Sequence, residues 1–451
     1  MTPRTSSPGI ARCAATALGL IALACSAAKQ PETPAESGSD ASDAGADAPS
    51  PDAEAPGTIT SGAFGADTPG GLGGAVLPVT TLDASGPGSL AEALATPGPR
   101  VIVFEVGGSV DLAMTRLDIV QPFVTVAGQT APPPGITLIR GGMRVMTHDV
   151  VIQHVRFRMG DAGTTVPAGF EPDVTTDGAA AHDVLFDHVS VAWGVDENLS
   201  VSGPRFDGPE GTSRNVTIRN SIIAEGLRNS VHEKGAHSMG TLVHDYCTGV
   251  AVIRNLYAHN DERNPWFKGF ASGAVVNNVV YNPGRWAMRL GAVPNEWTSS
   301  GITPEGPRVS IVGNYLKFGV DTPASQTMVG TNSAGAAYLE DNVALDAAGS
   351  AVPIASAAVT VLAEKPAWPA NIEVLSALQA VDWVVAHAGA RPRDRDAVDA
   401  RIVSEFLAGG GTIRDSQEAV GGYPSAEPVE RRLDVPDDVA PWLEALAAEL
   451  E

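Results

Sequence analysis

Cysteine is scarce in this sequence, with three residues in a chain of 451. Cys13 and Cys25 fall in the first 25 residues, so Cys247 stands alone in the remainder. A lone cysteine excludes an intramolecular disulfide there, and the fold must therefore be held by apolar burial. Hydrophobic residues make up 43% of the chain, which is enough for a large core.

Basic residues are also in deficit, because 29 Lys and Arg stand against 52 Asp and Glu, for a net charge of −23. This balance excludes a general nucleic-acid binder, since phosphate neutralisation requires clustered Lys and Arg. Acidic residues are dense over 29–60 and again over 426–451. We expect 426–451 to be an acidic C-terminal tail whose charges are solvated.

The apolar run near the N-terminus, residues 14–24, is too short to span a bilayer as a helix. Arg4 and Arg12 precede it, which is typical of an export signal. The run ends in Ala22-Leu23-Ala24-Cys25, which resembles the lipobox of bacterial lipoproteins, although Leu is usual at the position of Ala22. The resemblance implies lipidation of Cys25, and ordinary signal cleavage near the same place is the alternative.

The first 60 residues are thus interpreted as a signal peptide (1–25) and a disordered linker (26–60). The linker is rich in Pro, Ala, Ser and Asp, and its composition cannot bury enough surface to fold. We expect an extracellular protein or an outer-membrane lipoprotein that touches the membrane only through its N-terminal lipid.

A strand–bend–strand phrase recurs along the chain at intervals of 23 to 36 residues. The 49 Gly and 34 Pro favour turns over an all-helical bundle, and each phrase alternates apolar residues with a period of two. We therefore predict an all-β fold, a right-handed single-stranded parallel β-helix with an internal asparagine ladder. The phrases align on His154, His188, Asn220, Asn255, Asn278, Asn314 and Asn342.

Covers for the ends of this solenoid are also visible in the sequence. Ser89-Leu90-Ala91-Glu92 has the spacing of a capping box and predicts a short helix over 89–95. Helical patterns over 376–388 and 394–408 predict a small C-terminal helical region. We assign the β-helix to 61–370 and the helical extension to 371–425.

Polar residues concentrate between 158 and 268 in two groups. The first group is acidic, and oxygen donors from several loops suit Ca²⁺, whereas the Cys/His spacing of a zinc site is absent. It comprises Asp161, Asp173, Asp177, Asp187, Asp196 and Glu197. The second group is basic and predicts a site for an acidic ligand. It comprises His232, Lys234, His237, Arg263 and Lys268.

Several segments resemble the secreted pectate lyases of bacteria. They are FGADTPGG and SGPGSLAEAL near the start, GQTAPPPGITL, LFDHVSVAWGVDENLS (185–200), HEKGAHSMG, HNDERNPW (259–266) and RDRDAVDARIVSEF with DSQEAVGGYP near the end. The resemblance implies a β-helix enzyme that cleaves polygalacturonate by Ca²⁺-assisted β-elimination.

Carried over by residue, the resemblance implies that Arg263 is the base that removes the C5 proton and that Lys234 contacts substrate beside it. Asp173, Asp196 and Glu197 fall where Ca²⁺ ligands are expected.

The basic residues His237 and Lys268 complete the expected substrate site, together with Trp266. Trp266 stands where a second Arg is usual in the family, which departs from the pattern.

Two other functions stay open at this point. One is a polygalacturonase on the same fold, which would need two carboxyl groups at a fixed separation across the bond. The other is a non-catalytic, surface-tethered glycan-binding β-helix, for which Trp266 is the best argument. In each case the expected partner is an acidic polysaccharide and the chain is expected to be a monomer.

Overall fold

The computed structural model describes residues 64–161, 170–370 and 372–451. The expected signal peptide and its lipidation site, Cys25, lie outside these residues, as does the whole of the expected linker. Within the described part of the chain, no helix combines the length and apolar character needed to cross a membrane.

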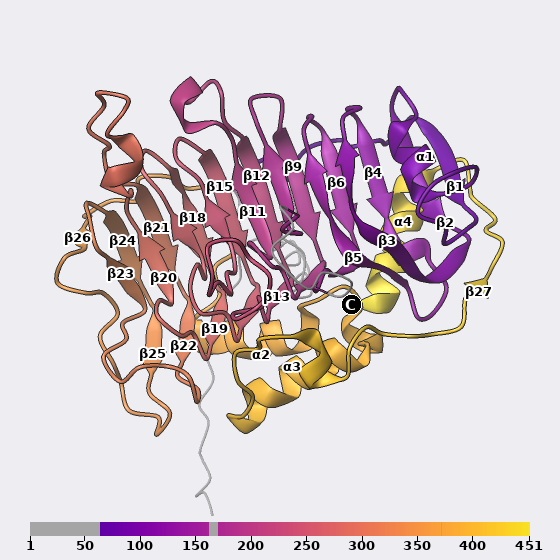
Figure 1. Ribbon diagram of the computed structural model, residues 1–451. Coiled ribbons are helices and arrows are strands. Elements are labelled where there is room, and N and C mark those ends of the chain that lie inside the picture. The colour runs from indigo at the N-terminus through magenta and orange to yellow at the C-terminus, as the bar shows by residue number, and fades with distance from the viewer. Residues whose placement is uncertain (1–63, 162–169, 371) are drawn as a thin grey trace, which may run out of the picture. The chain divides into compact units, whose positions relative to one another are not determined.

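The strands of residues 75–361 form stacked coils in which each strand pairs in parallel with the next coil (Figure 1). The first sheet has 11 strands. They are β1 (Ala75–Val79), β2 (Arg100–Phe104), β4 (Val124–Ala127), β6 (Val150–Gln153), β9 (His182–Asp187), β12 (Arg214–Arg219), β15 (Thr248–Ile253), β18 (Ser272–Val276), β21 (Arg308–Val312), β24 (Ala336–Glu340) and β26 (Thr360–Val361).

The second strand of each coil belongs to another row. This second row contains β7 (Val155–Arg158), β10 (Ser190–Ala192), β13 (Ile222–Ala224), β16 (Leu256–Ala258), β19 (Val279–Tyr281), β22 (Tyr315–Lys317) and β25 (Val343–Leu345).

The third row contains β3 (Val106–Ile119), β5 (Ile136–Val145), β8 (Val174–Asp177), β11 (Leu199–Ser202), β14 (Leu242–Val243), β17 (Trp266–Phe267), β20 (Met288–Leu290) and β23 (Val329–Thr331). The long strand β5 pairs with both β7 and β8 and so joins the second and third rows. This is the predicted parallel β-helix, with right-handed crossovers as such connections require.

Alternating side chains of each strand point into the coil and form one continuous core. Many of its members are β-branched or aromatic, for example Val184 and Phe186 of β9 and Val216 and Ile218 of β12, all fully buried. The same registers repeat in the next coils, since Val216 pairs with Val250 and Ile218 with Val252. The period of two in the sequence thus fixes which side chains are internal.

The asparagine ladder is present over four of the seven predicted positions. The side-chain oxygen of Asn278 accepts from the backbone N–H and Nδ2 of Asn255, at 3.0 and 2.9 Å. The side-chain oxygen of Asn314 accepts in the same way from Asn278, and that of Asn342 accepts from Asn314. Each oxygen therefore satisfies a buried backbone N–H at the bend of the previous coil.

The prediction that Asn220 is a rung of this ladder is wrong by one residue. Because Arg219 pairs with Ile253, Asn220 lies opposite Arg254, and Ser221 is the residue that faces Asn255. Asn220 instead occupies the left-handed position of the bend, with φ of 53°, and its Nδ2 donates to Asp187.

Replacing Asn278 with alanine is expected to lower the free energy of unfolding by about 2–4 kcal/mol, because it leaves several buried hydrogen-bonding groups without partners. The groups include the backbone N–H of Asn255 and the carbonyl of Val252. The urea midpoint measures the loss. Asn342→Ala is the control, since Asn342 is only half-buried at the end of the ladder and water can replace it. Equal losses for both variants would contradict the ladder's role.

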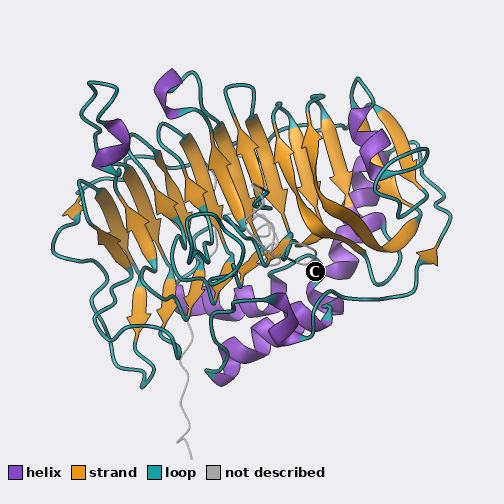
Figure 2. Cartoon of the chain, in the orientation of Figure 1, coloured by secondary structure: helices purple, strands orange, loops and turns teal. Residues whose placement is uncertain are grey.

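Helices cover the N-terminal end and one side of the coils (Figure 2). As predicted, α1 (Leu90–Ala95) begins at Ser89, whose hydroxyl accepts from the N–H of Glu92. The helices α2 (Ala377–His387) and α3 (Ala397–Ala408) pack their apolar faces on the outside of the second row. The third row is left for the site described below.

The expectation of a solvated tail over 426–451 is wrong. Residues of this segment form β27 (Val429–Glu430), which pairs antiparallel with β3, and α4 (Val439–Leu450). Leu443 of α4 is buried against Val101 and Val103 of the first sheet. Most acidic residues of this segment lie at exposed positions, and α4 also has an apolar face. The overall acidic composition gave no sign of that face.

Candidate functional site

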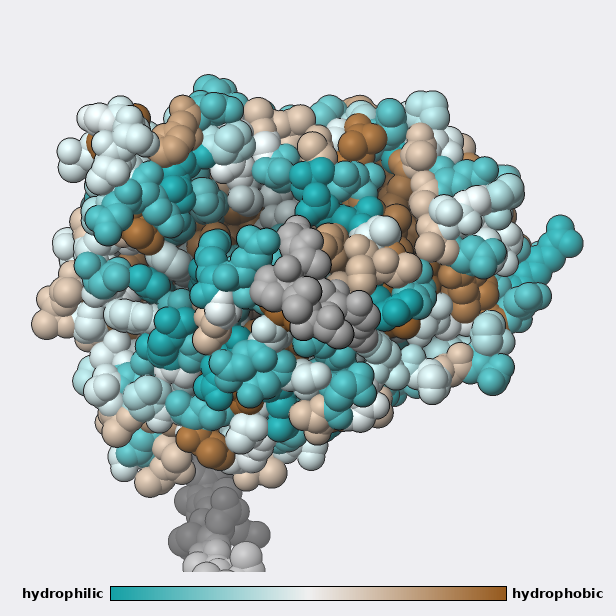
Figure 3. Space-filling model, in the orientation of Figure 1, coloured by the Kyte–Doolittle hydropathy of each residue, from teal (hydrophilic) through white to brown (hydrophobic). Residues whose placement is uncertain are grey.

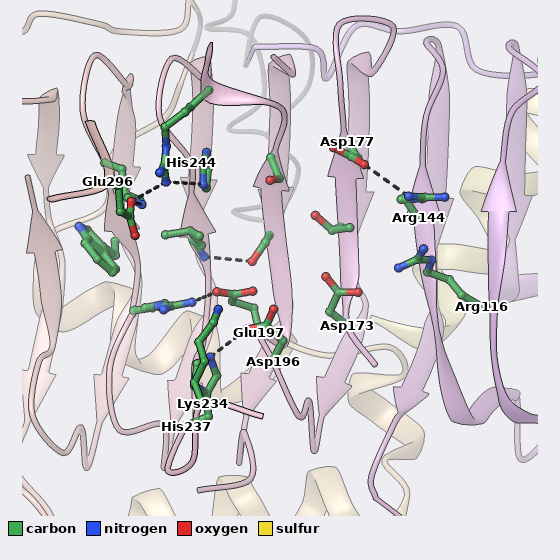
Figure 4. Close-up of a pocket in the computed structure, with 18 residues that line it drawn as sticks. Arg116, Arg144, Asp173, Asp177, Asp196, Glu197, Lys234, His237, His244 and Glu296 are labelled. Carbon is green, nitrogen blue, oxygen red and sulfur yellow. Dashed lines mark hydrogen bonds and ion pairs between the residues drawn. The ribbon is translucent and has the colours of Figure 1, made fainter. Parts of the chain in front are cut away.

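A cleft of about 530 Å³ lies along the outer face of the third row (Figure 4). The eight residues assigned to the expected catalytic, substrate and Ca²⁺ sites all line it: Lys234, His237, Arg263, Trp266, Lys268, Asp173, Asp196 and Glu197. The surface seen in Figure 3 is largely hydrophilic, with apolar residues only in small separate patches.

The site forms because the loops from the second to the third row stack in register. The backbone of Glu197 forms an isolated parallel β-bridge with Met239 of the next coil. Met239 forms another with Glu262 of the coil after it. Asp196 and His237 are thus held beside these bridges, together with Arg263, which follows Glu262. Three loops that are remote in sequence meet at one place because the coils set their spacing.

The acidic side of the cleft carries two carboxylates in contrasting environments. Burial raises the pKa of Asp173 to about 7, and the nearby charge of Asp196 adds to the increase. Burial also acts to raise the pKa of Asp196, but hydrogen bonds from His232 and His237 outweigh it and hold that pKa below its usual range. The carboxylate of Asp173 has no hydrogen bond or ion pair to another described residue, although its backbone carbonyl accepts from the N–H of Met143.

A pair of stacked histidines orients Asp196. The rings of His232 and His237 lie 3.6 Å apart, and His237 Nε2 is 2.8 Å from Asp196 Oδ1. The backbone N–H of Lys234 donates to His232 Nδ1, so Nε2 carries the proton in neutral His232 and faces Glu171 at 3.1 Å. The sequence had suggested substrate contact for His237, and the structure places it against Asp196.

Arg263 lies at the centre of the cleft in a left-handed backbone conformation, with φ of 66°. Its guanidinium forms an ion pair with Glu197 and lies 5.3 Å from the ring centre of Trp266. Burial lowers the pKa of Arg263 to about 10. The negative charge of Asp196 acts to raise this pKa, and the positive charge of Arg289 lowers it further. Arg263 is therefore easier to deprotonate than an ordinary arginine.

Trp266 packs against a cation that sequence reasoning missed. Arg289 of β20 lies 3.8 Å from the ring centre of Trp266 and forms an ion pair with Glu262 at 2.9 Å. β17 pairs with β20 in register, Trp266 opposite Arg289, so the arginine comes from the next coil. No local motif could reveal this pair.

Further cations stand at both ends of the cleft. At one end Lys268 forms ion pairs with Glu296 and Asp245, and Arg205 pairs with the same two carboxylates. At the other end lie Arg116 and Arg144, from β3 and β5. Sequence reasoning missed all three of these arginines, because their neighbours are set by coil register.

Two carboxylates of the acidic group lie elsewhere. Asp187 is buried at the turn between β9 and β10, where Arg219 binds it at 2.8 Å. Asp161 does not line the cleft. Neither contributes to a site with Asp173.

The donor set of the cleft is compatible with Ca²⁺. Asp173, Asp196 and Glu197 offer only oxygen atoms, as a hard cation prefers. The charged form of Asp173 is disfavoured beside Asp196, and a shared cation would relieve this repulsion. The three do not form one of the tight groups of the described residues whose donor atoms all lie within 4.8 Å of each other.

No family model matches the chain. Curated relatives match most of it. "Probable pectate lyase C" of Aspergillus oryzae is 35% identical over 372 residues, which is 80% of this chain and 79% of the relative. The protein of that name from Emericella nidulans is 33% identical and covers 83% of each chain. These relatives are fungal, so they support the expected pectate lyase family without its bacterial branch.

Solved structures share the fold. The cedar pollen allergen jun a 1 is 17% identical, with a TM-score of 0.53 over 73% of this chain and 92% of its own. A pectate lyase bound to a hexasaccharide is 12% identical, with a TM-score of 0.51 over 73% and 96%. At these identities the likeness supports the parallel β-helix alone.

The fold and the cleft together define a class, the parallel β-helix enzymes whose polar residues line a groove across the coils. The match to the curated relatives at 33–35% identity covers 80% or more of this chain. The chain belongs to the pectate lyase family.

Proposed function

We propose that this protein cleaves pectate by β-elimination, with Arg263 as the base and Ca²⁺ as the cofactor. The observation that carries the proposal is the position of Arg263, which is buried among carboxylates in a cleft rich in cations. An acidic polymer suits this cleft, because its basic side chains extend from one end to the other.

The reaction needs a base, a stabilised carbanion and a leaving group. Arg263 accepts the C5 proton, the released electron pair forms the C4–C5 double bond, and the C4–O bond breaks. When bound, Ca²⁺ supplies a Lewis acid to the uronate carboxylate, which makes the C5 proton more acidic. Asp173, Asp196 and Glu197 would hold the ion, and Glu197 must release Arg263 before that side chain can act as a base.

Product chemistry tests this proposal directly. The protein is incubated with polygalacturonate and Ca²⁺, and ultraviolet absorbance of the unsaturated product and new reducing ends are both followed. Elimination yields both signals together. New reducing ends without absorbance would instead identify a hydrolase, and binding without either signal would identify a glycan-binding protein.

Lys234 is expected to contribute to substrate affinity. It is exposed in the cleft and forms no ion pair to another described residue, so its ammonium group is free for a uronate carboxylate. Lys234→Ala should lower kcat/KM about 10-fold, corresponding to one charge-assisted contact. Steady-state kinetics measure this, and Lys365→Ala is the control because Lys365 pairs with Glu340 outside the cleft. Unchanged kcat/KM would remove Lys234 from the site.

The proposal includes a bacterial origin, export and tethering at the outer membrane through Cys25. It is supported by the N-terminal pattern, whose basic start, short apolar run and lipobox-like end are typical of exported bacterial lipoproteins. We also propose that the enzyme acts as a monomer. Mass spectrometry of the membrane-extracted protein would detect the lipid, and a Cys25→Ser variant should lose it.

A further inference from the structure

Two histidines lie one above the other at successive coils, outside the cleft. His154 is at the turn between β6 and β7, and His188 is at the turn between β9 and β10. Their rings are 5.1 Å apart with planes within 4° of parallel, and both are almost fully buried, at 1% and 2% exposure. The carboxylate of Glu451, which follows α4, reaches both rings.

The distances within this group are those of ligands around one metal ion. Glu451 Oε1 is 3.8 Å from His154 Nε2 and 3.5 Å from His188 Nδ1, beyond the usual range of N–H···O hydrogen bonds. Tetrahedral Zn²⁺ with bonds of about 2.0–2.1 Å separates neighbouring donor atoms by about 3.3–3.4 Å. The three donor atoms all lie within 4.8 Å of one another.

The hydrogen bonding of His154 leaves the correct nitrogen free. Its Nδ1 is 2.8 Å from the carbonyl oxygen of Ala390, which can only accept, so Nδ1 carries the proton. The lone pair of Nε2 then faces the carboxylate of Glu451, and two acceptors face each other unless a cation lies between them. Donation of the second ring N–H to a backbone carbonyl is typical of metal-binding histidines.

The ring of His188 also lacks a complete set of hydrogen-bond partners. Its Nδ1 lies 3.0 Å from Asp187 Oδ1 and 3.5 Å from Glu451 Oε1, and its Nε2 has no hydrogen-bond partner among the described residues. A buried ring nitrogen without a hydrogen bond calls for a further partner such as an ion.

The competing explanation is an imidazolium at His188 that bridges Asp187 and Glu451. Asp187 also accepts from Arg219 at 2.8 Å and from Asn220 Nδ2 at 2.9 Å, and against burial its charge raises the pKa of His188, so this explanation accounts for His188. It does not account for His154. An imidazolium at His188 would also leave Nε2 of His154 facing Glu451 with no proton between them. A metal ion satisfies both rings and the carboxylate together.

We propose that His154, His188 and Glu451 bind Zn²⁺ or a similar transition-metal ion, which fastens the end of α4 to two coils of the β-helix. The ion would take three donors from the protein, and a water would supply the fourth ligand of a tetrahedral site. The sequence argued against zinc because no local Cys/His spacing is present. The ligands are instead brought together by coil stacking and by the return of the C-terminal segment.

Calorimetric titration with ZnCl₂ tests the site in the metal-stripped full chain. His237→Gln serves as the parent, because Asp196, His232 and His237 form a second group that could bind zinc. The parent should bind one equivalent and melt at a higher temperature with zinc. Adding Glu451→Gln or His154→Gln should weaken binding by at least about 100-fold and remove the increase in melting temperature.

The matched control is His148→Gln. His148 stacks on His182 at 4.9 Å, but its Nδ1 pairs with Asp149 and no third ligand completes a group among the described residues. This variant should bind zinc like the parent. If His154→Gln fails to fold, Glu451→Gln decides, because Glu451 is part-exposed and the change preserves its shape. Zinc binding and melting temperature that are the same in the parent and in Glu451→Gln would overturn the proposal.

Discussion

Arg263→Lys is expected to reduce turnover on polygalacturonate by roughly 10²–10⁴-fold, the usual contribution of a positioned base. Lysine keeps the positive charge but loses the planar guanidinium that pairs with Glu197 and lies over Trp266. Its amine would not reach the same point in the cleft. Because a base acts mainly in the transition state, kcat should fall while KM changes little.

Steady-state kinetics and thermal unfolding of the same preparations measure these effects. Arg285→Lys is the control, since Arg285 is mostly exposed and pairs with Asp261 and Glu262 on the neighbouring loop. That variant should keep most of its activity. If Arg263→Lys retained the turnover and melting temperature of the unaltered protein, Arg263 would be a structural ion-pair residue and not the base.

Removal of Ca²⁺ is expected to abolish elimination, and its return should restore it. Asp196→Ala and Asp173→Asn should each eliminate Ca²⁺-dependent activity, because each removes an oxygen donor from the group that would hold the ion. Ca²⁺ should also raise the melting temperature of the unaltered protein, since it binds the folded state only. That increase should be absent from both variants.

Calorimetry with CaCl₂ separates loss of binding from loss of chemistry. Asp161→Asn is the control, because Asp161 belongs to the same acidic stretch of sequence but does not line the cleft. It should bind Ca²⁺ like the unaltered protein. Full activity in excess chelator, or wild-type turnover in Asp196→Ala, would reject these residues as ligands.

The repeat and the family were predictable from the sequence because they depend on local patterns. The period of two marks internal side chains, and bends need polar residues in every coil. The register of the ladder was not predictable at Asn220. Each bend has a left-handed residue followed by a ladder residue, and asparagine suits both positions, so residue type cannot tell them apart.

The site was predictable only where its residues share a segment. Asp196 with Glu197 and Arg263 with Trp266 belong to recognisable stretches of sequence. Arg289 and Arg144 come from other coils, and their approach depends on strand pairing across loops of varying length. Such convergence has no signature within a single stretch of sequence.

The packing of α4 has a consequence for the order in which the chain acquires its structure. Val101 and Val103 belong to an early coil, yet Leu443, which covers them, comes far later in the sequence. The edge of β3 that pairs antiparallel with β27 likewise stays unpaired until β27 has been made. During vectorial synthesis the first coils therefore expose this apolar surface until α4 has been made.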